Sequence, residues 1–184
     1  MSNAHGSSNS ECLPNQALKA VESLEQHRNR TGKISMLKIT VIAIGKLKER
    51  FWKEACSEYL KRLGAYAHVS VRELADSNKE READLIEGAL EAIGPAHVVL
   101  LDIRAKECSS EGLAEKLDKL TVHGISHVVF IIGGSDGVTE SIKKTASERL
   151  SFGPITLPHN LARVVLLEQI YRACKINRGE PYHK

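Results

Sequence analysis

The chain has 184 residues, of which 27% are charged and 42% hydrophobic, and its formal net charge is +3. This is the composition of one globular domain, and so small a positive charge is only a mild sign of an anionic partner. The chain contains no apolar run of about 18 residues and no secretory signal, so we expect a cytoplasmic protein. Its cysteines lie far apart without a Cys-x-x-Cys pair, which argues against a bound metal and against a disulfide framework (Cys12, Cys56, Cys108, Cys174).

Residues 1–35 differ in character from the rest of the chain. Ser-Asn-Ala after Met1 resembles an expression scar, and the polar stretch that follows leads to a possible short helix from about Asn15. A second methionine, Met36, stands directly before the first strand-like run. We therefore expect a weakly ordered extension or a short helix in residues 1–35, and a single domain in residues 36–184.

From Met36 onward, strand and helix patterns alternate. Apolar, β-branched runs predict five strands: Leu37–Ile44, His68–Leu74, His97–Ile103, His127–Ile132 and Pro154–Pro158. Helical spacing of apolar residues, with capping residues and glycine stops, predicts five helices: Lys48–Leu63, Lys79–Ile93, Ser110–Leu120, Val138–Arg149 and Leu161–Asn177. Three of the strands are apolar on both faces and must be covered on both sides. The pattern therefore predicts an α/β fold, a mostly parallel sheet with helices on both faces.

Three glycines follow the fourth predicted strand in the sequence HVVFIIGGSDGVTESI, at Gly133, Gly134 and Gly137. Ligands of open α/β sheets bind beyond the carboxyl ends of strands, and glycine lets a ligand approach the backbone, although a plain tight turn would use the same residues. The spacing matches neither the P-loop nor the GxGxxG dinucleotide motif, and Asp136 would place a negative charge beside a pyrophosphate. A nucleoside that carries a cation suits this turn better.

Several separated motifs resemble one known family. HVVFIIGGSDG, LSFGPITLPH, ARVVLLEQIYRACKINRGEPYHK and the opening ITVIAIGKLKERFWKEACSEYLKRLG are similar to the ribosomal RNA large-subunit methyltransferase H family, of the SPOUT class. The resemblance covers nearly all of residues 36–184. It implies S-adenosylmethionine as cofactor with no metal, a C-terminal trefoil knot, a homodimer, and N3-methylation of a pseudouridine in 23S rRNA of the ribosome or large subunit.

The resemblance also implies a cofactor pocket built from three segments. Its residues would be Leu101, Gly133, Phe152, Gly153, Pro154, Ile155, Thr156 and Leu157. Without the resemblance, residues 152–157 would be interpreted as an ordinary edge strand. A non-catalytic RNA-binding module remains an alternative function, and a nucleotide-dependent oxidoreductase is a weaker one.

The C-terminal segment combines an apolar helix with a polar tail. The helix is apolar over much of its circumference, which fits either a dimer interface or a helix in the core of one chain. Methylation of N3 requires a base for its proton and cations for the developing charge, and histidine has a suitable reference pKa of about 6.5. The candidate catalytic residues are His183, Tyr182, Arg163, Arg178 and Glu180. A frayed terminus is the alternative, and His159 either caps the last helix or contacts the substrate.

Overall fold

The computed structural model describes residues 36–182. Our predictions about residues 1–35, and about His183 as a catalytic base, lie outside the described residues. The segment Met36–Lys184 is a compact unit of its own. No helix in residues 36–182 is long and apolar enough to cross a membrane.

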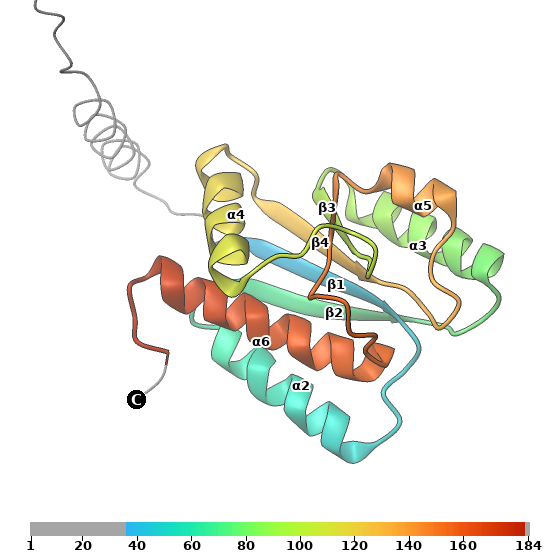
Figure 1. Ribbon diagram of the computed structural model, residues 1–184, viewed down its shortest axis with the longest axis horizontal. Helices are drawn as coiled ribbons and strands as arrows, with labels where there is room; N and C mark the ends of the chain where they lie inside the picture. The colour runs from blue at the N-terminus through green and yellow to red at the C-terminus, as the bar shows by residue number, and fades with distance from the viewer. Residues whose placement is uncertain (1–35, 183–184) are drawn as a thin grey trace, which may run out of the picture. The chain divides into compact units, whose positions relative to one another are not determined.

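Five parallel strands form one sheet in the order β2-β1-β4-β3-β5 (Figure 1). The strands are β1 (Lys38–Ile44), β2 (His68–Leu74), β3 (His97–Leu101), β4 (His127–Ile132) and β5 (Glu148–Leu150). All six residues of β4 are buried, as expected for a strand between two others with helices on both faces. The parallel α/β fold predicted from the sequence is confirmed.

Helices cover both faces of this sheet and divide the core into two layers. On one face lie α2 (Arg50–Leu63), α4 (Ser110–Val122) and α6 (His159–Asn177), and on the other lie α3 (Lys79–Ile93) and α5 (Glu140–Thr145) (Figure 1). Alternate residues of the central strands point into the two layers: Val128 and Phe130 belong to the α2–α4–α6 layer, whereas Val129 and Ile131 face α3 and α5.

The predicted helix Val138–Arg149 is wrong in extent, because its last two residues belong to a strand. The helix α5 ends at Thr145, and Ala146 is already extended, with φ −66° and ψ 130°. Glu148–Leu150 pair with β3, and Glu148 also bonds His97 and forms an ion pair with Lys116. Pairing with the sheet edge overrides the helical pattern of the sequence here.

The predicted strand Pro154–Pro158 is also wrong, since this segment contains no strand. Its two prolines have no backbone N–H to donate to a neighbouring strand, and Gly153 before them has a φ of +115°. The chain from Ser151 to Pro158 is instead an irregular connection between β5 and the start of α6. The expected trefoil knot in this part of the chain stays a prediction.

Candidate functional site

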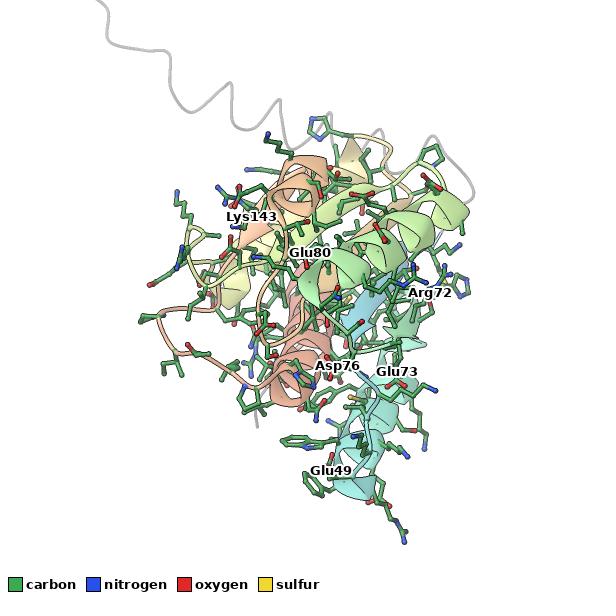
Figure 2. The ribbon with its side chains drawn as sticks, turned by 90° about the vertical axis from the view of Figure 1, so that its right-hand side faces the viewer. Glu49, Arg72, Glu73, Asp76, Glu80 and Lys143 are labelled. Carbon is green, nitrogen blue, oxygen red and sulfur yellow. The ribbon has the colours of Figure 1, made fainter. Side chains whose placement is uncertain are left out.

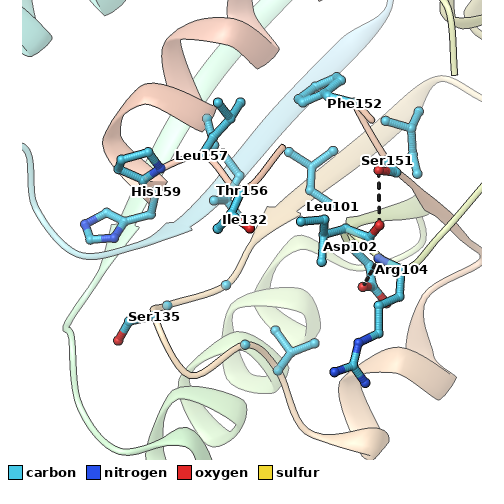
Figure 3. A pocket seen from close by; sticks show the side chains of 18 of the residues that line it. Leu101, Asp102, Arg104, Ile132, Ser135, Ser151, Phe152, Thr156, Leu157 and His159 are labelled. Atoms are coloured by element: carbon cyan, nitrogen blue, oxygen red, sulfur yellow. Dashed lines mark hydrogen bonds between the residues drawn. The ribbon is translucent and has the colours of Figure 1, made fainter. Parts of the chain in front are cut away.

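A cavity of about 830 Å³ lies where the carboxyl ends of β3, β4 and β5 meet the beginning of α6 (Figure 3). Most of its lining comes from three connections, residues 101–104, 132–138 and 150–158, and from His159 and Ala162 of α6. Because β3 stands between β4 and β5 in the sheet, connections that are far apart in the sequence converge here. This is the edge at which open parallel sheets bind ligands.

Apolar side chains form a large part of the cavity wall. They include Leu101, Ile103, Ile132, Val138, Leu150, Phe152, Ile155, Leu157 and Ala162. Leu150 is fully buried, whereas Ile155 is 75% exposed, which is unusual for a large apolar side chain. A wall of this kind can accept a flat apolar ring, and the exposed backbone of the connections supplies hydrogen-bonding groups beside it.

Polar side chains hold two of these connections in place. Asp102 accepts a hydrogen bond from the backbone N–H of Arg104 at 2.9 Å, and its other carboxylate oxygen lies 3.4 Å from Arg149. The Ser151 side chain is 2% exposed, accepts from the Gly153 N–H at 3.1 Å, and lies 3.0 Å from the Gly153 carbonyl oxygen. The residues after β3 and β5 therefore have a fixed arrangement before any ligand binds (Figure 3).

The turn after β4 also requires glycine because of contacts within the turn itself. Gly137 has a φ of +73°, and its N–H donates to the carbonyl oxygen of Gly134 at 3.1 Å. A Cβ at Gly133 would lie 2.8 Å from Cγ1 of Val138, closer than real Cβ contacts. The missing side chain of Gly133 therefore makes room for Val138, although the Gly133 backbone lines the cavity.

Most of the expected cofactor-binding residues line this cavity. Those that do are Leu101, Gly133, Phe152, Gly153, Ile155, Thr156 and Leu157. Pro154 is exposed and does not line it. The sequence analysis missed polar lining residues from four elements or connections: Lys79, Asp102, Arg104, Ser135 and Lys143. Asp102 lies within the predicted strand His97–Ile103 but directly follows the observed strand β3, and a charged residue near the end of an otherwise apolar run is the one signal that could have identified it.

His159 is the first residue of α6 and lines the cavity, but it does not cap the helix. The residue at the cap position is Pro158, which has no side-chain hydrogen bond to the helix. The imidazole lies against the end of β1, where a Cβ at Gly45 would be 3.2 Å from Nε2. Of the two roles expected for His159, contact with a ligand fits its position.

Arg163 was expected to be catalytic, but it lies in the core beside the cavity rather than in its wall. Its side chain is 1% exposed, pairs with Glu73 at the end of β2, and donates to the carbonyl oxygen of Gly45 at 2.8 Å. Glu73 also accepts from the backbone N–H of Leu47 at 3.1 Å. Arg163 therefore ties the ends of β1 and β2 to α6.

The other expected catalytic residues in the described tail pack near α2 and α6, and none of them lines the cavity. Arg178 donates to the carbonyl oxygen of Ala65 at 2.8 Å and lies over the ring of Tyr66, 4.3 Å from its centroid. Glu180 accepts hydrogen bonds from Tyr66 at 2.6 Å and from Lys175 at 2.8 Å. These contacts order the tail, which is therefore not frayed up to this point.

Tyr182 contacts two residues of α6 that the sequence analysis did not select, Glu168 and Arg172. Its hydroxyl donates to Glu168 at 2.6 Å, and the guanidinium of Arg172 lies 3.7 Å from its ring centroid. Glu168 and Arg172 are themselves paired at 2.7 Å. Burial, and then the hydrogen bond to Glu168, raise the pKa of Tyr182 to about 12, so at neutral pH this phenol donates a proton in a hydrogen bond.

Comparison with known proteins gives a consistent result. A family model described as "Predicted SPOUT methyltransferase" matches residues 37–183. Relatives named "Ribosomal RNA large subunit methyltransferase H" from Bacillus thuringiensis (strain Al Hakam) and Bacillus cereus (strain B4264) are 49% identical over 159 residues, covering 80% of this chain and 100% of each relative. The structure of a probable methylase family protein from Haemophilus influenzae Rd KW20 aligns with a TM-score of 0.50 at 13% identity. It covers 81% of this chain and 69% of that one, a likeness of fold alone.

Proposed function

The chain belongs to the SPOUT methyltransferase family, and we propose that it methylates N3 of a pseudouridine in 23S rRNA with S-adenosylmethionine as donor. The observation that carries this proposal is the cavity at the carboxyl ends of β3, β4 and β5, which joins the three segments expected to bind the donor. The relatives named as methyltransferases of large-subunit ribosomal RNA support the choice of substrate, because the chain spans their whole length.

The lining of the cavity suits this donor. Bound S-adenosylmethionine would supply an electrophilic methyl group on a sulfonium. Leu101, Phe152 and Leu157 offer apolar surface for its adenine, and the backbone of residues 133–137 and 153–157 offers hydrogen bonds. The turn after β4 carries the acidic Asp136, which suits a cation better than a phosphate.

The residues of the tail would act on the nucleotide. Transfer to N3 requires loss of its proton, and His183 is the candidate base because its ordinary pKa lies near neutral pH. Tyr182 stays protonated at neutral pH and would donate a hydrogen bond to the base or stack on it. Arg178 would stabilise negative charge on the base or bind a neighbouring phosphate, and Glu180 would orient cations beside it.

The proposed enzyme is a homodimer. Arg178, Glu180 and Tyr182 do not line the cavity of their own chain, so in this proposal the tail of one chain completes the cavity of its partner. The core-facing side of α6 packs in the layer shared with α2 and α4, which leaves Ile176 37% exposed and Val165 half-buried for a partner helix.

Contact with RNA would extend to the start of α2. Phe51 is 58% exposed and lies beside Trp52, with ring centroids 4.7 Å apart. Lys46, Lys48 and Lys53 are exposed along the same segment. Aromatic rings among cations can stack on unpaired bases and contact phosphates. In this proposal, both protomers together recognise the shape of the ribosomal RNA substrate. The enzyme acts in the cytoplasm, where ribosomes assemble.

A methyl-transfer assay tests the proposed reaction. Ribosomes, large subunits and free 23S rRNA from a strain that lacks the gene would be incubated with donor labelled in its methyl group. We expect label at N3 of one pseudouridine, with ribosomes or large subunits preferred over free rRNA. Label on another atom or another RNA, or no label on any of the three substrates, would contradict the proposal.

Donor binding separates this function from the two alternatives. At 100 times its dissociation constant, a ligand stabilises the folded state by about 2.7 kcal/mol. We expect S-adenosylmethionine to raise the melting temperature and NAD(P) to leave it unchanged. No shift with the donor would favour a non-catalytic RNA-binding module, and a shift with NAD(P) alone would favour an oxidoreductase.

Mixing two inactive variants tests whether the site is shared between protomers. One variant lacks residues 182–184, and the other carries Leu101→Trp, which fills the donor cavity. We expect neither to methylate ribosomes alone, and mixed dimers to recover up to about a quarter of wild-type activity, because one dimer site combines an intact cavity with an intact tail. A mixture that stays inactive, although mixed dimers form, would show that tail and cavity act within one chain.

A further inference from the structure

A buried carboxyl group lies directly behind the glycine turn of the donor cavity. Glu82 is on the first turn of α3 and is 4% exposed, and its Oε1 accepts a hydrogen bond from the backbone N–H of Ser77 at 3.1 Å. Figure 2 shows this part of the chain, where Asp76 is labelled before α3 and Glu80 is labelled on that helix. Glu82 does not line the cavity itself.

The carboxyl group of Glu82 occupies the space that a side chain at Gly134 would need. A Cβ at position 134 would lie 2.7 Å from Oε2, 2.9 Å from Oε1 and 3.1 Å from Cδ of Glu82. All three atoms belong to one planar carboxyl group, and its movement away from position 134 is opposed by the hydrogen bond from Ser77 and by the burial of Glu82. Glycine at 134 and glutamate at 82 are therefore a matched pair.

The environment of Glu82 raises its pKa. Burial is the main cause; the hydrogen bond from the Ser77 N–H opposes it, whereas a hydrogen bond with the side chain of Asp76 and the charges of Asp76 and Asp136 add to it. Two carboxyl groups can share a hydrogen bond only if one of them keeps a proton. A protonated Glu82 can thus accept from Ser77 with one oxygen and donate to Asp76 with the other.

We infer that Glu82 is a positioning residue for the methyl donor. By packing its carboxyl group against Gly134, it sets the position of the glycine turn in the wall of the cavity. Gly134 and its neighbours Gly133 and Ser135 line the cavity, so a shift of the turn changes the wall that the donor contacts. The identity of the ligand rests on the function proposed above. The contact between Glu82 and Gly134 does not depend on it.

A double-mutant cycle between the two positions tests this inference. The variants are Glu82→Ala, Gly134→Ala and the double variant, with the dissociation constant of S-adenosylmethionine measured by calorimetry and the melting temperature measured without ligand. We expect each single change to weaken binding about tenfold or more. In the double variant the methyl group introduced at position 134 enters the space left by Glu82, so the two losses should be less than additive by a factor of roughly ten.

Conservative and matched variants separate positioning from a general loss of stability. Glu82→Gln has the shape and hydrogen bonds of the neutral acid, so we expect its dissociation constant to stay within about twofold of the wild type. Glu80→Ala, at an exposed position of the same helix, and Gly88→Ala, whose Cβ would meet nothing within 4 Å, should leave binding unchanged.

Unchanged donor affinity in a folded Glu82→Ala variant would overturn the inference, as would strictly additive losses in the cycle. If Glu82→Gln is as impaired as Glu82→Ala, the positioning role of a neutral carboxyl group is wrong. If the wild type binds no S-adenosylmethionine at all, the proposed function fails instead. The cycle in melting temperature then still reports whether residues 82 and 134 are coupled.

Discussion

The hydroxyl group of Tyr182 lies 2.6 Å from Glu168 and donates a hydrogen bond to its carboxylate. Tyr182 belongs to the tail, whereas Glu168 lies in the middle of α6, in the turn after the one that contains Arg163. The guanidinium of Arg172 lies over the ring of Tyr182 and also pairs with Glu168. This contact fixes where the tail runs along α6, so the described tail is held up to Tyr182 by a specific polar cluster.

Tyr182→Phe should therefore impair the reaction and spare donor binding. The variant keeps the aromatic ring over Arg172 and loses only the hydroxyl group. We expect the rate of methyl transfer to ribosomes to fall roughly tenfold or more, and the dissociation constant of the donor to change less than twofold. Single-turnover kinetics and calorimetry would measure the two quantities. A loss of donor affinity as large as the loss of rate would contradict this assignment.

The Tyr182 phenol should lose its proton at a higher pH than an ordinary tyrosine. Burial and the bond to Glu168 raise the pKa of Tyr182 to about 12, against an ordinary value of 10. Subtracting the absorbance titration of Tyr182→Phe at 295 nm from that of the wild type isolates this group. We expect its midpoint near 12, and Glu168→Gln should lower it because the carboxylate no longer disfavours the phenolate. A midpoint at 10 in the wild type would mean that the hydrogen bond does not form in solution.

The ion pair between the buried Arg163 and the partly exposed Glu73 predicts an asymmetric loss of stability. Arg163 is 1% exposed and Glu73 about one-third exposed. Glu73→Ala leaves the more deeply buried charge without its partner, so we expect it to lower the free energy of unfolding by about 3–5 kcal/mol. Arg163→Met keeps most of the apolar volume and should cost less, roughly 1–3 kcal/mol, mainly through the unpaired carbonyl group of Gly45.

Urea denaturation of both variants would measure these losses. The surface pair of Arg50 and Glu54 provides the control, because its side chains are 90% and 60% exposed, and Glu54→Ala should cost no more than about 0.5 kcal/mol. Equal losses for Glu73→Ala and Glu54→Ala would show that the buried pair does not hold the ends of β1 and β2 to α6.

Gly133→Val should destabilise the protein even without a ligand. A side chain at this position would fill the approach to the donor, and it would also strain the fold, because a Cβ here would lie 2.8 Å from Cγ1 of Val138. Overpacking of this kind costs about 1–3 kcal/mol, which thermal unfolding of the ligand-free protein would measure. Adding Val138→Ala, which removes the Cγ1 atom that the new side chain meets, should recover much of the loss. A ligand-free melting temperature equal to that of the wild type would show that the turn accommodates the side chain without strain.

The sequence was sufficient for four of the five strands, because their signals are local. The run HVVFII has no polar residue after His127, and such a strand needs cover on both faces wherever it lies in the sheet. The helix Lys79–Ile93 agrees with the prediction at both ends, since Asn78 accepts from the Arg81 N–H at its start and Gly94 follows its last residue.

The parts that the sequence did not predict depend on tertiary contacts. Glu148 belongs to a strand only because β3 offers it a free edge, and Lys116 and His97 hold its carboxylate there. Arg163 looks like a catalytic cation in the sequence, and only the positions of Gly45 and Glu73 reveal its buried role. Likewise, the reason for glycine at 134 lies 52 positions earlier in the chain, at Glu82.

The raised pKa of Glu82 predicts how stability varies with pH. Burial is its main cause, so the folded protein binds this proton more tightly than the unfolded chain, whose glutamate has a pKa of 4.5. The resulting stabilisation is fully present below pH 4.5 and is lost as the pH rises through the raised value in the folded state. Glu82→Gln has no proton to lose at this position.

We therefore expect the difference in free energy of unfolding, wild type minus Glu82→Gln, to become less favourable to the wild type between pH 4.5 and neutral pH. Urea denaturation at intervals of half a pH unit would measure it, and other titrating groups cancel in the difference because both proteins share them. A difference that stays constant over this range would mean that Glu82 titrates as it does in the unfolded chain. A difference that grows with pH would mean that the carboxylate, rather than the neutral acid, is the form that packs against Gly134.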